Sequence, residues 1–220
     1  MKTEILRPTS SVDFERAAQL IRRGALVAFP TETVYGLGAN GLDAEACARI
    51  YEAKGRPSDN PLILHIADLA MAHTVAADVP PLAAHLLTAF APGPLTVILP
   101  KASHIPDIVT GGLSTVGVRC PDHDVARRLI RVAGVPIAAP SANTSGRPSP
   151  TTAAMVHADL AGRIPLILDG GSCRLGVEST IVDCTEEGIV TILRPGAITR
   201  EMIAAELPHI AVCMDAALTA

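Results

Sequence analysis

Lys54 and Arg56, which could bind a phosphorylated ligand, lie where a helical pattern of the chain ends. They flank a glycine and are followed by Pro57. Two cations on a constrained loop can hold phosphate oxygens, because an arginine offers a bidentate fork and a lysine a point charge. Cations also favour the C-terminal ends of helices, so a solvated helix end explains Lys54 and Arg56 equally well when they are considered alone.

A second polar segment, Ser141-Ala142-Asn143, precedes a stretch rich in Ser, Gly and Pro. Its hydroxyl and amide groups suit phosphate and ribose oxygens, although such residues also form turns by bonding to their own backbone. His65 lies in the apolar run Leu62–Ile66, which favours a buried core histidine. Glu178 and Asp169 have no partner that spacing can establish, and we interpret both as structural.

The segment 36–41 matches the dinucleotide fingerprint G-x-G-x-x-G, but its context is wrong for that motif. Polar residues 31–33 separate it from the preceding apolar run, and the next helix pattern begins only at Asp43, whereas the fingerprint needs glycines that open the helix. We therefore expect a glycine-rich turn here. The chain contains no phosphate loop of the G-x-x-x-x-G-K-[ST] type and no G-x-S-x-G elbow.

Composition excludes several classes of protein. The chain has 220 residues, of which 49% are hydrophobic and 18% charged, so it can bury a core and is neither disordered nor a disulfide scaffold. A net charge of -4 provides no global basic field for a nucleic acid. The five cysteines form no C-x-x-C pair and no histidine forms H-x-x-x-H, so we expect reduced thiols and no zinc site. No apolar stretch approaches the roughly 20 residues of a membrane span, and we expect a cytoplasmic protein.

Apolar periodicity predicts the elements that must position these residues. Short apolar runs predict strands at Ala25–Phe29, Leu62–Ile66, Leu95–Leu99, Val116–Arg119, Pro136–Ala139, Pro165–Asp169, Thr180–Cys184 and Ile189–Arg194. Helical spacing predicts helices at Ser11–Arg23, Asp43–Ala53, Leu69–Ala77, Pro81–Phe90, Asp122–Ala133, Thr151–Leu160 and Thr199–Leu207, with Asp43, Asp122 and Thr199 as N-caps.

This alternation predicts an α/β fold: a twisted, mixed parallel and antiparallel sheet flanked by helices, with antiparallel pairing among the strands after Pro165. Ligands of open α/β sheets bind outside the strand ends, where the polar segments lie, so we expect an open concave cleft. No repeat or long linker divides the chain. We expect one domain over residues 1–206, followed by a C-terminal tail or linker remnant over residues 207–220.

Taken together and in this order, the motifs resemble one family, and the likeness runs from about Ser10 to Thr199. They are Phe29-Pro30-Thr31-Glu32-Thr33-Val34-Tyr35-Gly36-Leu37-Gly38, Lys54-Gly55-Arg56-Pro57, Asn60-Pro61-Leu62, Pro92-Gly93-Pro94-Leu95-Thr96, Val116-Gly117-Val118-Arg119, Pro140-Ser141-Ala142-Asn143-Thr144-Ser145-Gly146, Gly176-Val177-Glu178-Ser179-Thr180 and Leu193-Arg194-Pro195-Gly196. The chain resembles the YrdC-like L-threonylcarbamoyladenylate synthase family, in its single-domain form.

The resemblance implies a YrdC-like fold and a nucleotidyltransferase, with residues 1–206 as the catalytic domain. Members of the family convert L-threonine, bicarbonate or CO2, and ATP into L-threonylcarbamoyl-AMP and pyrophosphate, for the threonylcarbamoyladenosine modification of tRNA. Mg2+ should travel with the ATP phosphates and need no metal site on the protein. The partners implied are the downstream proteins that transfer the threonylcarbamoyl group and a weak contact with tRNA, without any membrane.

The resemblance also carries residue roles. The family's catalytic tetrad falls on Lys54, Arg56, Ser141 and Asn143, which would grip the nucleotide phosphates by electrostatic preorganisation. Asn60, Thr115, Ser149 and Arg194 would join the ATP side. The threonine pocket would comprise Thr33, His65, Arg119, Ser179 and the backbone at Ala139. Arg119 is the natural partner for the threonine carboxylate, and we interpret His65 as a neutral binding group rather than a base.

Two alternatives remain open. The same fold has been associated with double-stranded RNA, which would make the chain a non-catalytic RNA-binding or tRNA-binding module; its net charge argues mildly against this. YrdC-like domains of much longer chains also serve carbamoyltransferases that use carbamoyl phosphate. A salt-sensitive affinity for tRNA without release of pyrophosphate would favour the RNA-binding alternative.

Overall fold

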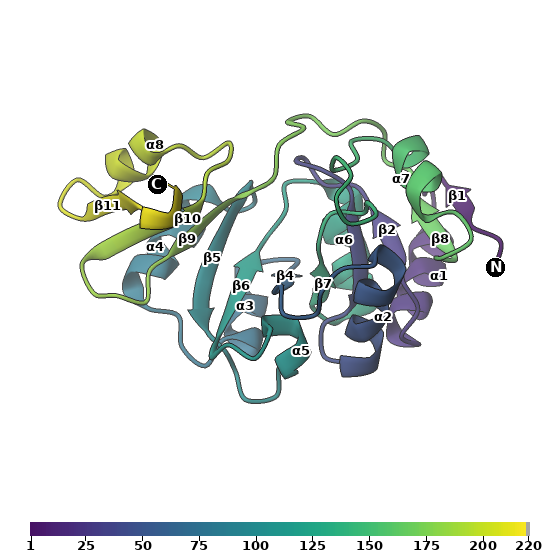
Figure 1. The fold of residues 1–220 in the computed structure, drawn as a ribbon, viewed down its shortest axis with the longest axis horizontal. Coiled ribbons are helices and arrows are strands. Elements are labelled where there is room, and N and C mark those ends of the chain that lie inside the picture. The colour runs from purple at the N-terminus through teal and green to yellow at the C-terminus, as the bar shows by residue number, and fades with distance from the viewer. Residues whose placement is uncertain (219–220) are drawn as a thin grey trace.

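One twisted sheet runs the length of the molecule (Figure 1). The computed structural model describes residues 1–218. Its 11 strands are β1 (Glu4–Leu6), β2 (Val27–Phe29), β3 (Gly36–Asn40), β4 (Ile63–His65), β5 (Leu95–Pro100), β6 (Thr115–Arg119), β7 (Ile137–Ala139), β8 (Leu166–Leu168), β9 (Thr180–Asp183), β10 (Ile189–Arg194) and β11 (Ala211–Met214).

The strand order is β1-β8-β2-β3-β7-β4-β6-β5-β9-β10-β11. Pairing is parallel between β1 and β8, β8 and β2, β4 and β6, β5 and β9, and β10 and β11, and antiparallel in the other pairs. The predicted mixed open sheet is therefore confirmed. Of the strands after Pro165, β9 and β10 pair antiparallel as expected, whereas β8 lies among parallel neighbours at the other end.

Helices cover the sheet on both faces. They are α1 (Ser11–Arg22), α2 (Ala44–Lys54), α3 (Leu69–Val75), α4 (Pro81–Phe90), α5 (Asp107–Thr110), α6 (Asp124–Ala133), α7 (Ala153–Leu160) and α8 (Arg200–Glu206), with a final 3-10 turn at Ala216–Leu218. Within residues 1–218, no helix is long and apolar enough to cross a membrane. Asp43 and Thr199 cap α2 and α8 as predicted, but Asp122 does not cap α6; the His123 side chain accepts from the backbone of Val125 instead.

The core follows from the alternation of side chains along the short strands. In β2, Val27 and Phe29 join the cluster beneath α1 and α6, while Ala28 between them belongs to the cluster on the opposite face. Both faces of this strand are buried, which explains why its sequence is continuously apolar. Burial also explains the spacing of apolar residues in α1. The buried residues form one stripe along the helix: Phe14, Ala17, Ala18 and Ile21.

The prediction of a glycine-rich turn over residues 36–41 is wrong, because Gly36–Asn40 forms strand β3 in the middle of the sheet. A Cβ atom on Gly38 would lie 2.7 Å from Ile137 Cγ2 and 2.8 Å from Phe29 Cε1. The glycine therefore makes room for the Phe29 ring, which packs over the strand. The close backbone approach that glycine permits is real, but it serves strand packing rather than a turn.

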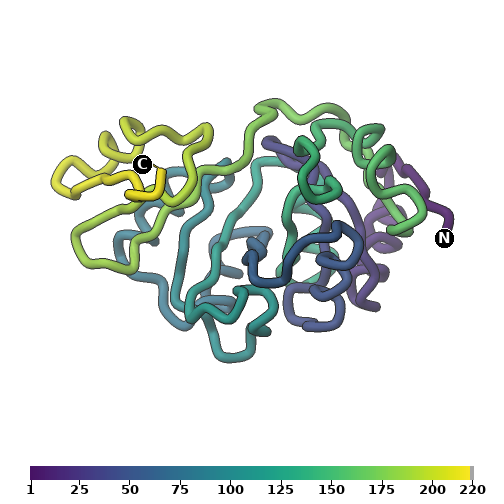
Figure 2. Tube along the Cα trace, viewed as in Figure 1, coloured from purple at the N-terminus to yellow at the C-terminus, as the bar shows by residue number. Residues whose placement is uncertain are grey.

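Three further elements lie outside the predicted set: β1, the short helix α5 and β11. Ala211–Met214 lies in the segment expected as a tail or linker remnant, but it forms β11 and pairs parallel with β10. Residues 219 and 220, the end of that segment, lie outside the described residues. The division of the chain at residue 206 stays a prediction. The first and last strands, β1 and β11, form the opposite edges of the sheet and lie in opposite halves of the molecule (Figures 1 and 2).

Candidate functional site

All five of the predicted amino-acid-binding residues surround one cavity, which we call the inner cavity. Its lining includes Thr33, His65, Arg119, Ala139 and Ser179, together with Ser141 and Arg194 from the predicted nucleotide side. These residues come from β4, β6, β7, the end of β10 and the segments that precede β3 and β9. Side chains distant in sequence therefore converge on a single hollow at strand ends.

A second hollow, the outer cavity, lies over β5, β6, β9 and β10 and has a volume of about 340 Å³. That volume falls within the range of about 300–1,000 Å³ found for small-molecule pockets. Asn60 and Thr115, both predicted on the nucleotide side, line it, and Ile63 lines both cavities. Thr96 lines the outer cavity and its hydroxyl lies 2.8 Å from that of Ser179 in the inner one. The two hollows are neighbouring parts of one site.

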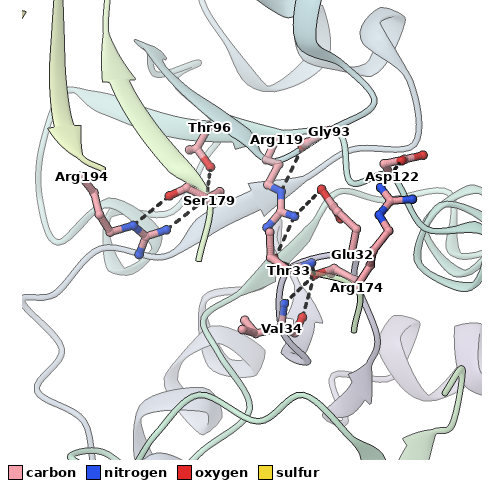
Figure 3. A network of polar contacts seen from close by, with 11 residues as sticks. Glu32, Thr33, Val34, Gly93, Thr96, Arg119, Asp122, Arg174, Ser179 and Arg194 are labelled. Atoms are coloured by element: carbon pink, nitrogen blue, oxygen red, sulfur yellow. Dashed lines mark hydrogen bonds and ion pairs between the residues drawn. The ribbon is translucent and has the colours of Figure 1, made fainter. Parts of the chain in front are cut away.

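The Arg119 guanidinium is fixed on one side and open on the other (Figure 3). Its Nε donates to Gly93 O at 3.3 Å, and its Nη2 donates to Thr33 Oγ1 at 3.0 Å and lies 2.7 Å from Glu32 Oε1. Within residues 1–218, no hydrogen-bond acceptor meets Nη1, although Arg119 lines the inner cavity. This nitrogen is available to a carboxylate ligand.

Glu32 is buried behind Arg119, with 2% of its surface exposed. Neither of its carboxylate oxygens accepts a hydrogen bond within the described chain, because the N–H groups of Nη2 do not align with the nearby oxygen. The positive charge of Arg119 compensates the negative charge of this buried carboxylate. The surrounding loop is rigid, since Thr31 Oγ1 accepts from the backbone of Thr33 and Val34, both at 3.2 Å.

Segment 170–179 crosses from β8 to β9 and is pinned to this loop. The backbone N–H of Leu175 donates to Glu32 O at 2.9 Å, and that of Gly176 donates to Thr33 O at 3.0 Å. Figure 2 shows the segment spanning the two halves of the molecule, and its last residues, Glu178 and Ser179, line the inner cavity. The loop that presents Thr33 and segment 170–179, which presents Ser179, are thus held together.

Lys54 lies at the end of α2 with 2% of its surface exposed, so the solvated alternative is wrong for this residue. Its Nζ donates to Ser141 O, to Asn143 O at 2.5 Å and to Asn143 Oδ1 at 3.3 Å. Burial, together with the smaller effect of the neighbouring Arg56 guanidinium, lowers the pKa of Lys54 to about 8. The lysine therefore brings the two predicted polar segments together and carries a charge that is costly in this position.

Arg56 connects this cluster to the outer cavity. Its Nη2 donates to Asn60 O at 3.3 Å and to Pro61 O at 3.2 Å. Its Nε is buried and has no hydrogen-bond partner within residues 1–218. Burial lowers the pKa of Arg56 as well. Arg56 therefore places a partly buried cation without a carboxylate partner between Lys54 and the outer cavity.

Arg194 joins the cavities from the end of β10. It donates from Nε to Ser179 O and from Nη2 to Ser179 Oγ, both at 3.0 Å (Figure 3), and its Nη1 forms an ion pair with Glu178. Glu178 Oε1 also accepts from Ser149 Oγ at 3.0 Å. Ser149, which lines neither cavity, is therefore tied to the site through Glu178.

His65 lies on β4 and is 4% exposed. Burial lowers its pKa to about 3, and the Arg119 charge acts in the same direction, so the ring is neutral near pH 7. Its Nδ1 lies 3.2 Å from Ile63 O. A carbonyl oxygen only accepts, so this contact places the hydrogen on Nδ1 and leaves Nε2 as an acceptor.

The charges divide the site into two ends. Arg119 and Arg194 each have a carboxylate partner, Glu32 and Glu178 respectively. In the part of the chain that the structure describes, Lys54 and Arg56 form no ion pair. The inner cavity therefore suits a small zwitterion, and the Lys54 end suits a polyanion.

The sequence reasoning missed Glu32 and Glu178. Both stand inside motifs quoted for the family resemblance, one residue before Thr33 and Ser179, and that adjacency was the available signal. We interpreted Glu178 as structural because spacing established no partner for it, but its side chain lines the inner cavity and contacts Ser149 and Arg194. Asp169 does have a structural role, since its Oδ1 lies 3.4 Å from the hydroxyl of Tyr35.

Together, the mixed sheet and the two-ended site define an α/β domain in which one end of the site suits a small zwitterion and the other suits a polyanion. No group of three or more His, Cys, Asp and Glu side chains that could hold a metal ion is found among residues 1–218. A family model with the description "Telomere recombination", that of the Sua5/YciO/YrdC domain, matches residues 19–196. The chain belongs to the Sua5/YciO/YrdC family.

Relatives with curated names include the threonylcarbamoyl-AMP synthase of Pyrococcus abyssi (strain GE5 / Orsay), 56% identical over 187 residues that make up 85% of this chain and 55% of the relative. The protein of the same name from Bacillus subtilis (strain 168) is 54% identical over 90% of this chain and 57% of the relative. The crystal structure of P. abyssi Sua5 complexed with L-threonine is 50% identical, with a TM-score of 0.91 over 96% of this chain and 62% of that one. The chain thus spans little more than half the length of these relatives.

Proposed function

We propose that the chain synthesises L-threonylcarbamoyl-AMP and pyrophosphate from L-threonine, bicarbonate or CO2, and ATP, as a nucleotidyltransferase. The observation that carries the proposal is the open Nη1 of Arg119 in a cavity next to cations that have no carboxylate partner. The names of the relatives and the L-threonine complex of P. abyssi Sua5 support it. We assign the activity to the domain formed by residues 1–206.

At the amino-acid end, the Arg119 Nη1 receives the threonine carboxylate while Nε and Nη2 stay anchored to the protein. The hydroxyl of Ser179 and the Nε2 acceptor of His65 provide partners for the substrate hydroxyl and amine. A site built around a hydroxyl can reject an analogue that lacks it by roughly 10⁴-fold. Valine should therefore be a very poor substrate.

At the nucleotide end, the adenosine part lies in the outer cavity and the phosphates lie towards Lys54, Arg56, Ser141 and Asn143. The protein's contribution is positioning and charge stabilisation. A carbamate oxygen attacks the α-phosphorus in line, and the bond from that phosphorus to the bridging oxygen breaks to release pyrophosphate. The carbamate is already an anion, so this step needs no base.

Mg2+ enters as part of the ATP substrate, since hard cations prefer phosphate oxygens. The product is a reactive mixed anhydride, which downstream proteins that transfer the threonylcarbamoyl group to tRNA would consume in the cytoplasm. A weak contact with tRNA would assist that transfer.

The test is pyrophosphate release by the purified chain. Release should require ATP, L-threonine and bicarbonate together, and the product should have the mass of threonylcarbamoyl-AMP. Release that continues without threonine, or that valine supports equally, would contradict the proposed substrate. Tight, salt-sensitive tRNA binding without any pyrophosphate release would instead support the RNA-binding alternative.

A further inference from the structure

One carboxylate side chain lines the inner cavity, that of Glu178. Glu32 is shielded behind Arg119 and is not part of the lining. The remaining titratable side chains of the lining are His65, Arg119 and Arg194. Within this cavity Glu178 is therefore the group that can neutralise a positive charge on a ligand.

The proposed substrate brings such a charge. An α-amino acid at neutral pH carries an ammonium group, and that nitrogen must lose its protons before it becomes a carbamate. His65 cannot accept them, because its ring is buried and lies beside the Arg119 cation. The hydroxyl groups of Thr33 and Ser179 are far weaker bases.

Glu178 has free acceptor capacity and access to water. Its Oε1 accepts one hydrogen bond from Ser149, and its Oε2 pairs with Arg194. Each carboxylate oxygen has two lone pairs, so both oxygens can accept another donor. The side chain is 36% exposed, which gives a bound proton a path to solvent.

We propose that Glu178 binds the amine of the amino-acid substrate and accepts the proton that this nitrogen loses when the carbamate forms. The assignment rests on the proposed function and adds a catalytic residue to it. In the step, the ammonium group first releases one proton to water. The nitrogen lone pair of the resulting free amine then forms a bond to the carbon of CO2, and a C=O electron pair moves onto oxygen. An N–H proton then passes to a Glu178 oxygen and on to water, leaving a carbamate anion.

Glu178 and Arg119 together explain why an amino acid would be selected. Arg119 offers its Nη1 to a carboxylate, and Glu178 offers its oxygens to an ammonium group. A 2-hydroxy acid of the same shape keeps the first contact and loses the charge of the second. The site should therefore prefer L-threonine to 2,3-dihydroxybutyrate, in which a hydroxyl replaces the amine.

The experiment measures the binding of both compounds by calorimetry to the full chain without ATP. Glu178→Gln should weaken L-threonine binding by about 10- to 100-fold, the loss expected for one hydrogen bond to a charged group, and leave 2,3-dihydroxybutyrate binding unchanged. Glu178→Asp keeps the charge and should restore part of the preference. The matched control is Glu187→Gln, which removes an exposed carboxylate of the β9–β10 turn and should change neither affinity.

Each outcome decides the assignment. A Glu178→Gln protein with an unchanged ratio of the two affinities overturns it, whether both affinities persist or both fall together, and the proposed function survives that result. Failure of the unaltered chain to bind L-threonine would remove the proposed function and this assignment with it. The two failures are distinguished by the unaltered protein alone.

Discussion

ATP binding should draw a proton onto Lys54 at alkaline pH. Burial lowers the pKa of this ammonium from 10.5 to about 8. That shift corresponds to about 3 kcal/mol of destabilisation of the charged form, and it is consistent with a side chain that is 2% exposed. Nearby phosphate charges should reverse the shift, because an opposite charge favours the ionised form.

The size of the uptake follows from the two protonation states. At pH 8 about half of the ligand-free protein has a neutral Lys54, so ATP should take up about half a proton per site. At pH 6.5 nearly all of it is already charged and uptake should fall below about 0.1. The affinity for ATP should decrease as the pH rises above 8, approaching tenfold for each pH unit until the pKa of the complex is reached.

The assay is titration calorimetry of Mg-ATP in buffers of different ionisation enthalpy at pH 6.5, 8 and 9. Lys54→Arg keeps the charge at every pH and should abolish the uptake. Lys101→Arg is the matched control, since Lys101 lines neither cavity and is paired with the exposed Asp107, and it should leave the uptake intact. Uptake that does not vary with pH, or that persists in Lys54→Arg, would refute the assignment of the proton to Lys54.

Three further predictions concern the scaffold of the site. Glu32→Ala should lower the free energy of unfolding in urea by about 3–5 kcal/mol, because it leaves a buried Arg119 charge without its partner; a loss below about 1 kcal/mol would show that the pair is solvated. The His65 ring should show no titration by NMR above pH 5, since its folded pKa is about 3. A lowered histidine pKa removes stability as the pH falls from about 6.5, and His65→Gln should abolish that part of the acid sensitivity. Gly38→Ala should lower the unfolding free energy by about 1–3 kcal/mol, since the new Cβ would lie 2.8 Å from Phe29 Cε1; an unchanged melting temperature would mean that the ring moves freely.

The parts of the fold that the sequence predicted share a physical cause. Helix α1 shows its buried stripe in the spacing of its apolar residues, and β2 and β8 are buried on both faces and therefore continuously apolar. Strand β3 was not predicted as a strand, because the side chain that packs over it belongs to the neighbouring strand β2. The glycines of β3 accept the Phe29 ring from the neighbouring strand, and nothing in a local window distinguishes that use of glycine from a turn.

The site also has features that the sequence predicted and features that depend on contacts between residues distant in sequence. Residue types marked Lys54 and Arg56 as ligands for anions, and the family resemblance marked Arg119. The carboxylate partner that balances the charge of Arg119 comes from elsewhere in the chain. Glu32 lies 87 positions before Arg119 and meets it only because β6 and the loop after β2 converge. Sequence spacing carries no information about that contact, so neither the ion pair nor the free Nη1 could be predicted.

These pairings determine which end of the site can hold which ligand. If Arg119 and Arg194 had no carboxylate partners, the inner cavity would attract phosphate as strongly as the Lys54 end does, and a triphosphate could bind in either direction. Glu32 and Glu178 cancel those two charges, so the excess positive charge remains at Lys54 and Arg56. A carboxylate can still use the open Nη1 of Arg119 through directed hydrogen bonds, which a neutralised pair retains. In the proposed function, the charges of the buried Glu32 and of the partly exposed Glu178 would therefore set the orientation of the two substrates.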